Sequence, residues 1–295
     1  MENTTKCALI TGGTSGIGYE LARLFAADGY NLVIVARNEE NLKQAAAELK
    51  GEGAGEVHTI AADLFQPEAA LQVYEKVKTM GTQVDVLVND AGQGEWGRFH
   101  KTDLQREIDL VQLNIISLMS LTKYFLQDMV ERNSGRILQL ASSLAKAPSP
   151  YMAVYAATKA FVLSFSEALV KELEETEVTV TALLPGATDT DFFHKAKAEG
   201  TVVYRETSLY DPAEVAKAGY EALMNGDATV QPGLKNKMQN AMSTLLPDGA
   251  VASNMEKQME SSMEQNGRSE ITHAASLRER EAINANSGGI NGDSK

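Results

Sequence analysis

The sequence predicts an α/β protein with a doubly wound parallel sheet, in a single domain that ends in a loosely ordered C-terminal tail. Three observations predict this fold class. Short aliphatic or β-branched runs alternate with longer segments of helical period along most of the 295 residues. Runs such as LVIV and VDVLV are apolar on both faces, as in parallel strands that helices cover on both sides. A glycine-rich turn follows the first run and precedes a helix.

The predicted elements alternate from the first strand onward. Strands are expected at 7–10, 32–35, 57–61, 84–88, 136–140, 178–184 and 228–230. Helices are expected near 17–28, 39–50, 67–80, 103–131, 151–176 and 212–225. Residues 1–254 form the predicted domain. Charged and small residues then take over, so 255–295 is predicted to be a polar, flexible tail, with a brief helix conceivable at 270–283 and a solvated appendage favoured over a docking motif.

Composition excludes several classes of protein. Hydrophobic residues at 43% and charged residues at 23% are globular values, whereas a net charge of −13 should repel nucleic acid and anionic lipid. Cys7 is the only cysteine and the four histidines lack metal-ligand spacing, so neither a disulfide scaffold nor a metal site is expected. MENTTK is unlike a signal peptide, and the apolar stretch 110–126 is too polar to cross a bilayer. A cytoplasmic protein without membrane contact is expected.

The turn TGGTSGIG places Gly12, Gly16 and Gly18 between the first strand and a helix that begins near Ile17. Glycines allow a tight turn there, and backbone amides at a helix N-terminus can hold a pyrophosphate. A purely structural turn is the weaker alternative. Two rival motifs fail: the P-loop lysine is missing, and Ser15 is no nucleophile elbow because Ile17 occupies the last glycine position.

The end of the second strand favours NADP over NAD, although NAD stays possible. NAD sites place a carboxylate there to bind the ribose 2′-hydroxyl, but the segment VARNEE offers Ala36. Arg37 can instead pair with a 2′-phosphate; the alternative is a surface cation that balances Glu39 and Glu40. After the third strand, Asp63 and Leu64 are candidates to bind the adenine.

A second group of residues is suited to proton transfer. Tyr155 and Lys159 lie four residues apart in YAATK and so on one helical face, where the ammonium should lower the pKa of the phenol. Ser142, at the end of the fifth strand, can hydrogen-bond a substrate carbonyl, with Ser143 as the fallback. Asn114, polar in an apolar helix, is structural on this basis alone.

Together these residues resemble the short-chain dehydrogenase/reductase family in its one-domain, Rossmann-like form. The matching segments are TGGTSGIG, Asn89-Asp90-Ala91-Gly92, Asn114, Ser142, YAATK and Pro185-Gly186 with Thr190, in the family's order. The resemblance implies that Tyr155 is the general acid/base, that Ser142 orients the carbonyl, that Lys159 also binds the nicotinamide ribose, and that Asn114 holds a water in a proton relay. Asp90 stands where the family usually has a second asparagine, and little harm is expected from it.

The cofactor-binding set combines the motif and the resemblance. Its members are Gly12, Thr14, Ser15, Gly16, Ile17, Gly18, Arg37, Asp63, Leu64, Asn89, Ala91, Gly92, Tyr155, Lys159, Pro185, Gly186, Thr188 and Thr190.

The predicted function is interconversion of a carbonyl and a secondary alcohol by hydride transfer with NADP(H). Aromatic residues after Pro185, including Phe192 and Phe193, suggest an apolar substrate, and similarity to bacterial ketoacyl or ketosteroid reductases does not fix it. His194 is expected to be a hydrogen-bonding loop residue. The alternatives are a non-catalytic NADP(H)-binding sensor or scaffold and, less favoured, a serine hydrolase. Surplus apolar residues in the helices 103–131 and 151–176 suggest a homo-oligomer.

Overall fold

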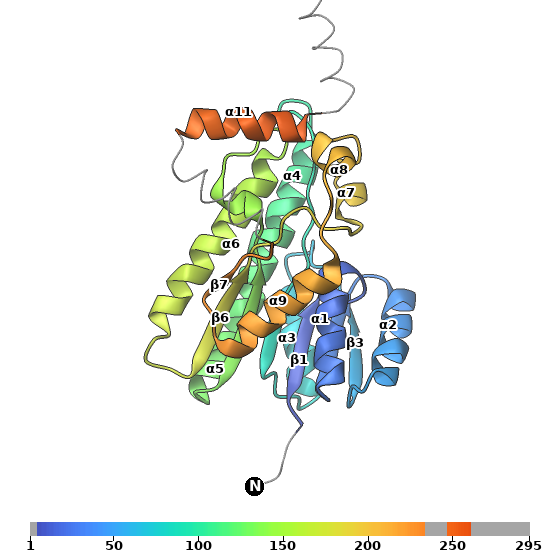
Figure 1. The fold of residues 1–295 in the computed structure, drawn as a ribbon. Coiled ribbons are helices and arrows are strands. Elements are labelled where there is room, and N and C mark those ends of the chain that lie inside the picture. Colours follow the sequence, from blue (N-terminus) through green and yellow to red (C-terminus); the bar gives the residue numbers. More distant parts are fainter. Residues whose placement is uncertain (1–4, 234–246, 261–295) are drawn as a thin grey trace, which may run out of the picture.

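A computed structural model describes residues 5–233 and 247–260. Its strands form one seven-stranded parallel sheet in the order β3-β2-β1-β4-β5-β6-β7 (Figure 1). Every strand falls on a run predicted from the sequence, so the predicted fold class is confirmed. The strands are β1 (Cys7–Thr11), β2 (Asn31–Ala36), β3 (Val57–Ala61), β4 (Val86–Asn89), β5 (Gly135–Leu140), β6 (Val178–Leu183) and β7 (Thr229–Val230).

Helices cover both faces of the sheet, as the two-sided apolar strands require. In Figure 1, α1 (Gly16–Ala27) and α9 (Pro212–Asn225) lie in front of the strands, and their buried side chains join those of α2 (Glu39–Gly51) in one core cluster. A second cluster covers the opposite face. Its helices are α3 (Ala69–Thr79), α5 (Leu118–Glu131) and α6 (Ala153–Glu172).

The segment predicted as one helix at 103–131 has an irregular middle. It consists of α4 (Leu104–Val111), a π-helical turn η1 (Gln112–Ser117) and α5. A π turn inserts an extra residue into the helix without changing its apolar period enough to be seen in a sequence, and such turns often lie at functional sites. Asn114 lies in this turn.

α6 also passes a simple test for a membrane-spanning helix. Among the described residues it is the one helix long and apolar enough, with a mean hydropathy of 1.3. Its buried residues include Tyr155, Lys159, Val162 and Leu169, the last of which belongs to the core against the sheet. This is the packing of a core helix.

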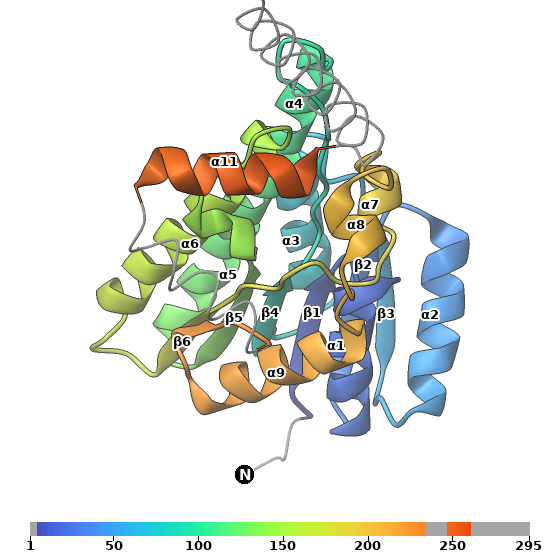
Figure 2. The ribbon, with the colours of Figure 1, turned by 45° about the horizontal axis from the view of Figure 1, so that its top comes forward.

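Three further helices lie at the carboxyl ends of the strands. α7 (Phe192–Lys195) and α8 (Val202–Glu206) follow β6, and residues 192–209, which contain them, are called the lid below. α11 (Asp248–Met259) lies across this end of the molecule beside α7 and α8 (Figure 2).

The predicted domain boundary at 254 falls inside α11, so the tail prediction is wrong for residues 255–259. Val251, Met255 and Met259 repeat every four residues and are buried in a cluster with side chains of the lid. This apolar repeat was the signal in the sequence for a packed helix. The conceivable helix at 270–283 and the rest of the predicted tail lie outside the described residues.

Candidate active site

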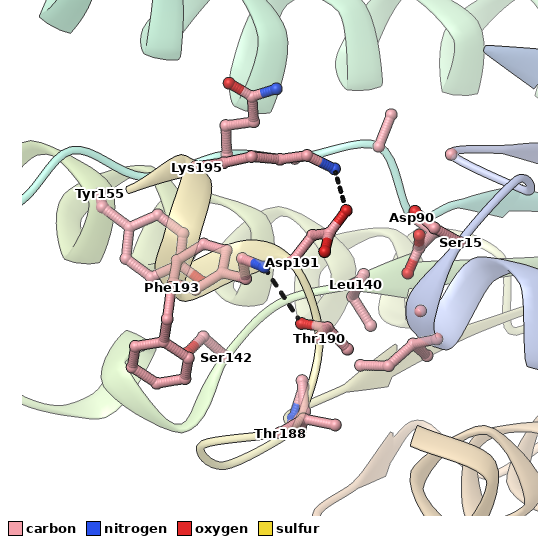
Figure 3. A pocket seen from close by; sticks show the side chains of 18 of the residues that line it. Ser15, Asp90, Leu140, Ser142, Tyr155, Thr188, Thr190, Asp191, Phe193 and Lys195 are labelled. Atoms are coloured by element: carbon pink, nitrogen blue, oxygen red, sulfur yellow. Dashed lines mark hydrogen bonds and ion pairs between the residues drawn. The ribbon is translucent and has the colours of Figure 1, made fainter. Parts of the chain in front are cut away.

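A cavity of about 630 Å³ opens at the carboxyl ends of the strands. It lies where the strand order reverses between β1 and β4, the place at which open α/β sheets bind their ligands. Its lining extends from Arg37 and Asn41 after β2, past the glycine turn, to Met259 of α11. Figure 3 shows Ser15 and Asp90 on one side of this cavity and Tyr155 on the other.

The glycine turn has the backbone that the sequence predicts. Gly12 and Gly16 have φ values of +73° and +58°, which disfavour any side chain. Thr11 ties the turn to the next loop, because its hydroxyl accepts hydrogen bonds of 3.1 Å from the amides of Asp90 and Ala91. The Ser15 side chain caps no amide at the start of α1. A turn without side chains beside the amides of a helix N-terminus fits a pyrophosphate.

Two residues predicted to bind the cofactor do not line the cavity. A Cβ atom on Gly18 would lie 2.7 Å from the Gly12 carbonyl oxygen and still closer to the Asp90 carboxylate, so the role of this glycine is close packing. Asn89 is buried, and its amide donates to Thr122 at 3.0 Å and to Gln139 at 3.1 Å. Its side chain faces α5 because a residue at the end of a strand points to one face of the sheet. The other predicted cofactor-binding residues line the cavity.

Ser142, Tyr155 and Lys159 converge on the cavity from two elements. Ser142 precedes a 3₁₀ turn, η2 (Ser143–Lys146), and its hydroxyl accepts a hydrogen bond of 3.1 Å from the Leu144 amide. Tyr155 and Lys159 lie one turn apart on α6. Ser142 also hydrogen-bonds the Tyr155 hydroxyl, whereas the Ser143 amide donates to the Pro185 carbonyl.

The predicted lowering of the Tyr155 pKa by Lys159 is wrong for this structure. Burial raises the pKa of Tyr155 to about 12, opposed by the hydrogen bond from Ser142 and reinforced by the charge of Asp90. Burial also lowers the pKa of Lys159 to about 8, and the Asp90 carboxylate opposes that shift. The Lys159 ammonium lies 5.8 Å from the centre of the Tyr155 ring, and the upward shift of the Tyr155 pKa follows from burial and the charge of Asp90.

Asn114 reaches the site indirectly and does not line the cavity. Its side chain accepts from the Gln93 amide at 3.1 Å and donates to the Gln93 carbonyl at 2.9 Å and to Thr158 at 3.0 Å. The structural role read from the residues agrees with these bonds. A Cβ atom on Gly92 would lie 3.2 Å from the Lys159 ammonium and 3.4 Å from the Asn114 oxygen, so this glycine lets both side chains approach.

The far end of the cavity contains the residues predicted to select the cofactor. The Arg37 guanidinium lies over the Phe65 ring at 5.4 Å, and Asp63 and Leu64 line the cavity beside it. Glu40, one of the two carboxylates that Arg37 could have balanced, pairs with Lys43 at 3.1 Å. Arg37 is thus placed at the cavity rather than in that surface pair.

Asp90 contacts the glycine turn and affects the charges of the site, although the sequence predicted little effect of this residue. Its carboxyl group packs against Gly12 and Gly18, and one of its oxygens is buried without a hydrogen-bond partner. Burial raises the pKa of Asp90 to about 7, against the charge of Lys159, the Gly18 amide and the charge of Lys195. In the sequence, the aspartate at a position where the family usually has asparagine was the indication that residue 90 differs. No feature of the sequence indicates that Lys195 lies at the site.

The lid also carries an ion pair on its surface. His194 is exposed and pairs with Glu199 at 2.7 Å, in agreement with its predicted role as a hydrogen-bonding loop residue.

Within residues 5–233 and 247–260, no group of three or more His, Cys, Asp or Glu side chains is placed to hold a metal ion.

Comparisons with known proteins agree with this geometry. The family model described as short chain dehydrogenase matches residues 6–200. The uncharacterized oxidoreductase YvrD of Bacillus subtilis (strain 168) is 36% identical over 186 residues, 63% of this chain and 70% of that protein. The very-long-chain 3-oxoacyl-CoA reductase of Rattus norvegicus is 35% identical over 184 residues, 60% of this chain and 58% of that protein.

Solved structures resemble the whole described fold. A short-chain dehydrogenase from Sphingobium yanoikuyae in complex with NADPH has a TM-score of 0.73 and 29% identity, covering 81% of this chain and 94% of its own. The bulky-bulky ketone specific alcohol dehydrogenase from Comamonas testosteroni has a TM-score of 0.70 and 30% identity, covering 82% and 94%.

Proposed function

This chain belongs to the short-chain dehydrogenase family, and we propose that it interconverts an apolar carbonyl compound and its secondary alcohol by hydride transfer with NADP(H). The observation that carries the proposal is the convergence of Ser142, Tyr155 and Lys159 in the cavity that also contains the glycine turn. A proton-transfer group and a dinucleotide site in one cavity are what this reaction needs.

NADPH, when bound, supplies the hydride. The chain supplies the proton: Tyr155 holds it on its hydroxyl oxygen and gives it to the carbonyl oxygen during reduction. A pKa of about 12 keeps the phenol protonated at neutral pH, as a proton donor requires. Ser142 donates a hydrogen bond to the same substrate oxygen, and the Lys159 ammonium stabilises the phenolate that remains. In alcohol oxidation the same groups act in reverse.

The preference for NADP(H) rests on Arg37. Its guanidinium lies at the end of the cavity beside Asp63 and Leu64, and Ala36 precedes it where NAD sites place a carboxylate. A guanidinium can bind a phosphate through two hydrogen bonds. The NADPH in the Sphingobium yanoikuyae relative is consistent with this preference.

The apolar substrate is inferred from the opposite end of the cavity. Met152, Phe192 and Phe193 line it together with Met255 and Met259 of α11. Methionine and aromatic side chains form an adaptable apolar surface. The rat relative is a very-long-chain 3-oxoacyl-CoA reductase and the Comamonas testosteroni relative is specific for bulky ketones, which agrees with a roomy apolar subsite.

Oxidation of NADPH, followed at 340 nm against a panel of ketones, aldehydes and 3-oxoacyl esters, tests the proposal. Turnover of apolar carbonyl compounds with NADPH supports it. Binding of NADPH without turnover of any compound in the panel would favour the sensor or scaffold instead. Absence of both binding and turnover removes the proposed function altogether.

We also propose that the protein is a homo-oligomer. Apolar side chains on α4, η1 and α5 remain accessible, among them Leu104, Ile108, Ile116 and Met119, at 67%, 50%, 37% and 37% exposure. A second copy would remove this surface from water. Light scattering on the purified protein, with Ile108→Glu as the variant expected to dissociate it, checks the assembly.

A further inference from the structure

Lys195 is a cavity residue to which neither the motifs nor the comparisons give a role. It is the last residue of α7 in the lid, and its side chain lines the same cavity as Thr14, Ser15 and Gly16. In Figure 3 the side chain points in the direction of Asp90 and Ser15, and its tip lies beside Asp191. The Lys195 side chain is 40% exposed.

The segment that leads into the lid contacts the glycine turn. A Cβ atom on Gly16 would lie 3.1 Å from the Thr190 side chain, so the chain just before α7 touches the loop in which the dinucleotide phosphates are proposed to lie. The Asp90 carboxylate, which packs on that turn, is within the electrostatic range of both Lys159 and Lys195. Lys195 is therefore close enough to act on a charge held at the turn.

The cavity is lined by charges of both signs. Asp90 and Asp191 would disfavour a dianionic diphosphate, whereas Lys159 and Lys195 would attract one. Lys195 has as its partner Asp191, one turn before it, at 3.5 Å. The two side chains are 40% and 68% exposed, and such a surface pair contributes little stability, so the lysine can exchange it at small cost.

We propose that Lys195 binds the diphosphate of the dinucleotide from the lid side of the cavity, exchanging its ion pair with Asp191 for one with the phosphate oxygens. The inference rests on the proposed function. It makes the lid part of the cofactor site, so that the bound dinucleotide holds the beginning of the lid against the glycine turn. The diphosphate is then contacted by backbone amides of α1 on one side and by an ammonium on the other.

The test is the dissociation constant of NADPH, measured by calorimetry on the full chain. Lys195→Gln should weaken binding roughly five- to twentyfold, as expected for loss of a partly exposed charge-assisted contact. Lys217→Gln is the matched control, because Lys217 also pairs at i,i+4, with Glu221 at 4.0 Å, but on α9 and outside the cavity lining. It should change binding less than twofold.

Asp191→Asn separates a binding role from a structural one. If the pair only holds α7 in shape, removing either partner weakens NADPH binding. The proposal requires opposite signs: Lys195→Gln weakens binding, whereas Asp191→Asn strengthens it roughly two- to fivefold, because it frees the lysine and removes a repelling charge. Weaker binding in both variants would overturn the proposal.

Two fragments identify the group that Lys195 contacts. The loss caused by Lys195→Gln should persist with 2′-phospho-ADP-ribose, which retains the diphosphate, and disappear with adenosine 2′-monophosphate, which lacks it. It should also shrink between about 0.05 and 0.5 M salt. Equal losses with both fragments, or an effect confined to the KM of an acidic carbonyl substrate, would assign the lysine elsewhere. Wild-type affinity in Lys195→Gln removes only this inference; failure of the wild-type protein to bind either NADPH or NADH removes the proposed function with it.

Discussion

The ammonium nitrogen of Lys159 donates a 2.6 Å hydrogen bond to the carbonyl oxygen of Leu140, the last residue of β5. The bond joins the start of α6 to the end of the strand that precedes Ser142. It fixes the ammonium through a hydrogen bond to the backbone. The orientation of the ammonium is thus a property of the fold, and it is set before any substrate enters.

Tyr155→Phe should abolish turnover while leaving the dissociation constant of NADPH within about twofold of the wild-type value. The phenyl ring keeps the packing against Phe192, whose ring centre lies 5.0 Å away, but has no proton to transfer. We expect kcat to fall at least about a thousandfold, within the range for loss of a general acid. Steady-state kinetics and NADPH titration check this, and a variant that retains a tenth of the activity would contradict the assignment.

The two perturbed pKa values predict opposite pH profiles for the two directions. Tyr155, with a pKa of about 12, stays protonated between pH 6 and 9, so carbonyl reduction does not lose its proton donor there. Lys159, with a pKa of about 8, loses its charge as the pH rises through that value. Therefore kcat/KM for reduction should fall above pH 8, whereas alcohol oxidation, which needs the phenolate, should rise with pH up to about 8, where loss of the Lys159 ammonium begins to oppose it. Titration of NADPH over the same range controls for cofactor loss; reduction that accelerates from pH 7 to 9 would be the opposite result.

Arg37→Gln should weaken NADPH binding by roughly ten- to a hundredfold, equal to about 1.4–2.8 kcal/mol, and leave NADH binding within twofold. The variant removes the guanidinium proposed to bind the 2′-phosphate, a group that NADH lacks. Arg23→Gln is a suitable control, since Arg23 pairs with Glu20 and Glu52 outside the cavity lining. Equal affinity of the wild-type protein for both cofactors would remove the role given to Arg37.

Asp90→Asn should stabilise the protein in a pH-dependent manner. The pKa of Asp90 is raised from 3.8 to about 7 in the folded state, so between these values the folded chain keeps a proton that the unfolded chain releases. The free energy of unfolding therefore falls as the pH rises from 4 to 7, and the full penalty is present above 7. The variant does not titrate, so its Tm should exceed that of the wild-type protein at pH 8 by about 2–4 °C for each kcal/mol of penalty, and by much less near pH 4.

Thermal melts at both pH values check this difference, with Glu175→Gln as the control for removal of an exposed carboxylate. An equal effect of Asp90→Asn at pH 4 and pH 8 would show that folding does not raise the pKa of Asp90.

Local patterns in the sequence predicted the strands, the glycine turn and the positions of Ser142, Tyr155 and Lys159, because each depends on neighbouring residues and on the common edge of a parallel sheet. They could not predict to which face of the sheet the last residue of a strand points, and so Asn89 was placed in the cavity although it bonds Thr122 and Gln139.

Other features depend on contacts between distant segments. The pKa of Tyr155 depends on how much chain buries it, which an isolated YAATK helix does not reveal. The packing of Met255 and Met259 on the lid requires α11 to cross the molecule, although their spacing was visible. Lys195 is an ordinary surface lysine until the lid lies against the glycine turn.

The indole nitrogen of Trp96 donates a 2.7 Å hydrogen bond to the carbonyl oxygen of Met259, 163 residues further along the chain. During synthesis all seven strands leave the ribosome before Met259 does. The dinucleotide half of the cavity can therefore assemble on a nascent chain whose substrate half is still missing one wall. The wall formed by α11 is thus completed last, after the strands that position the rest of the site.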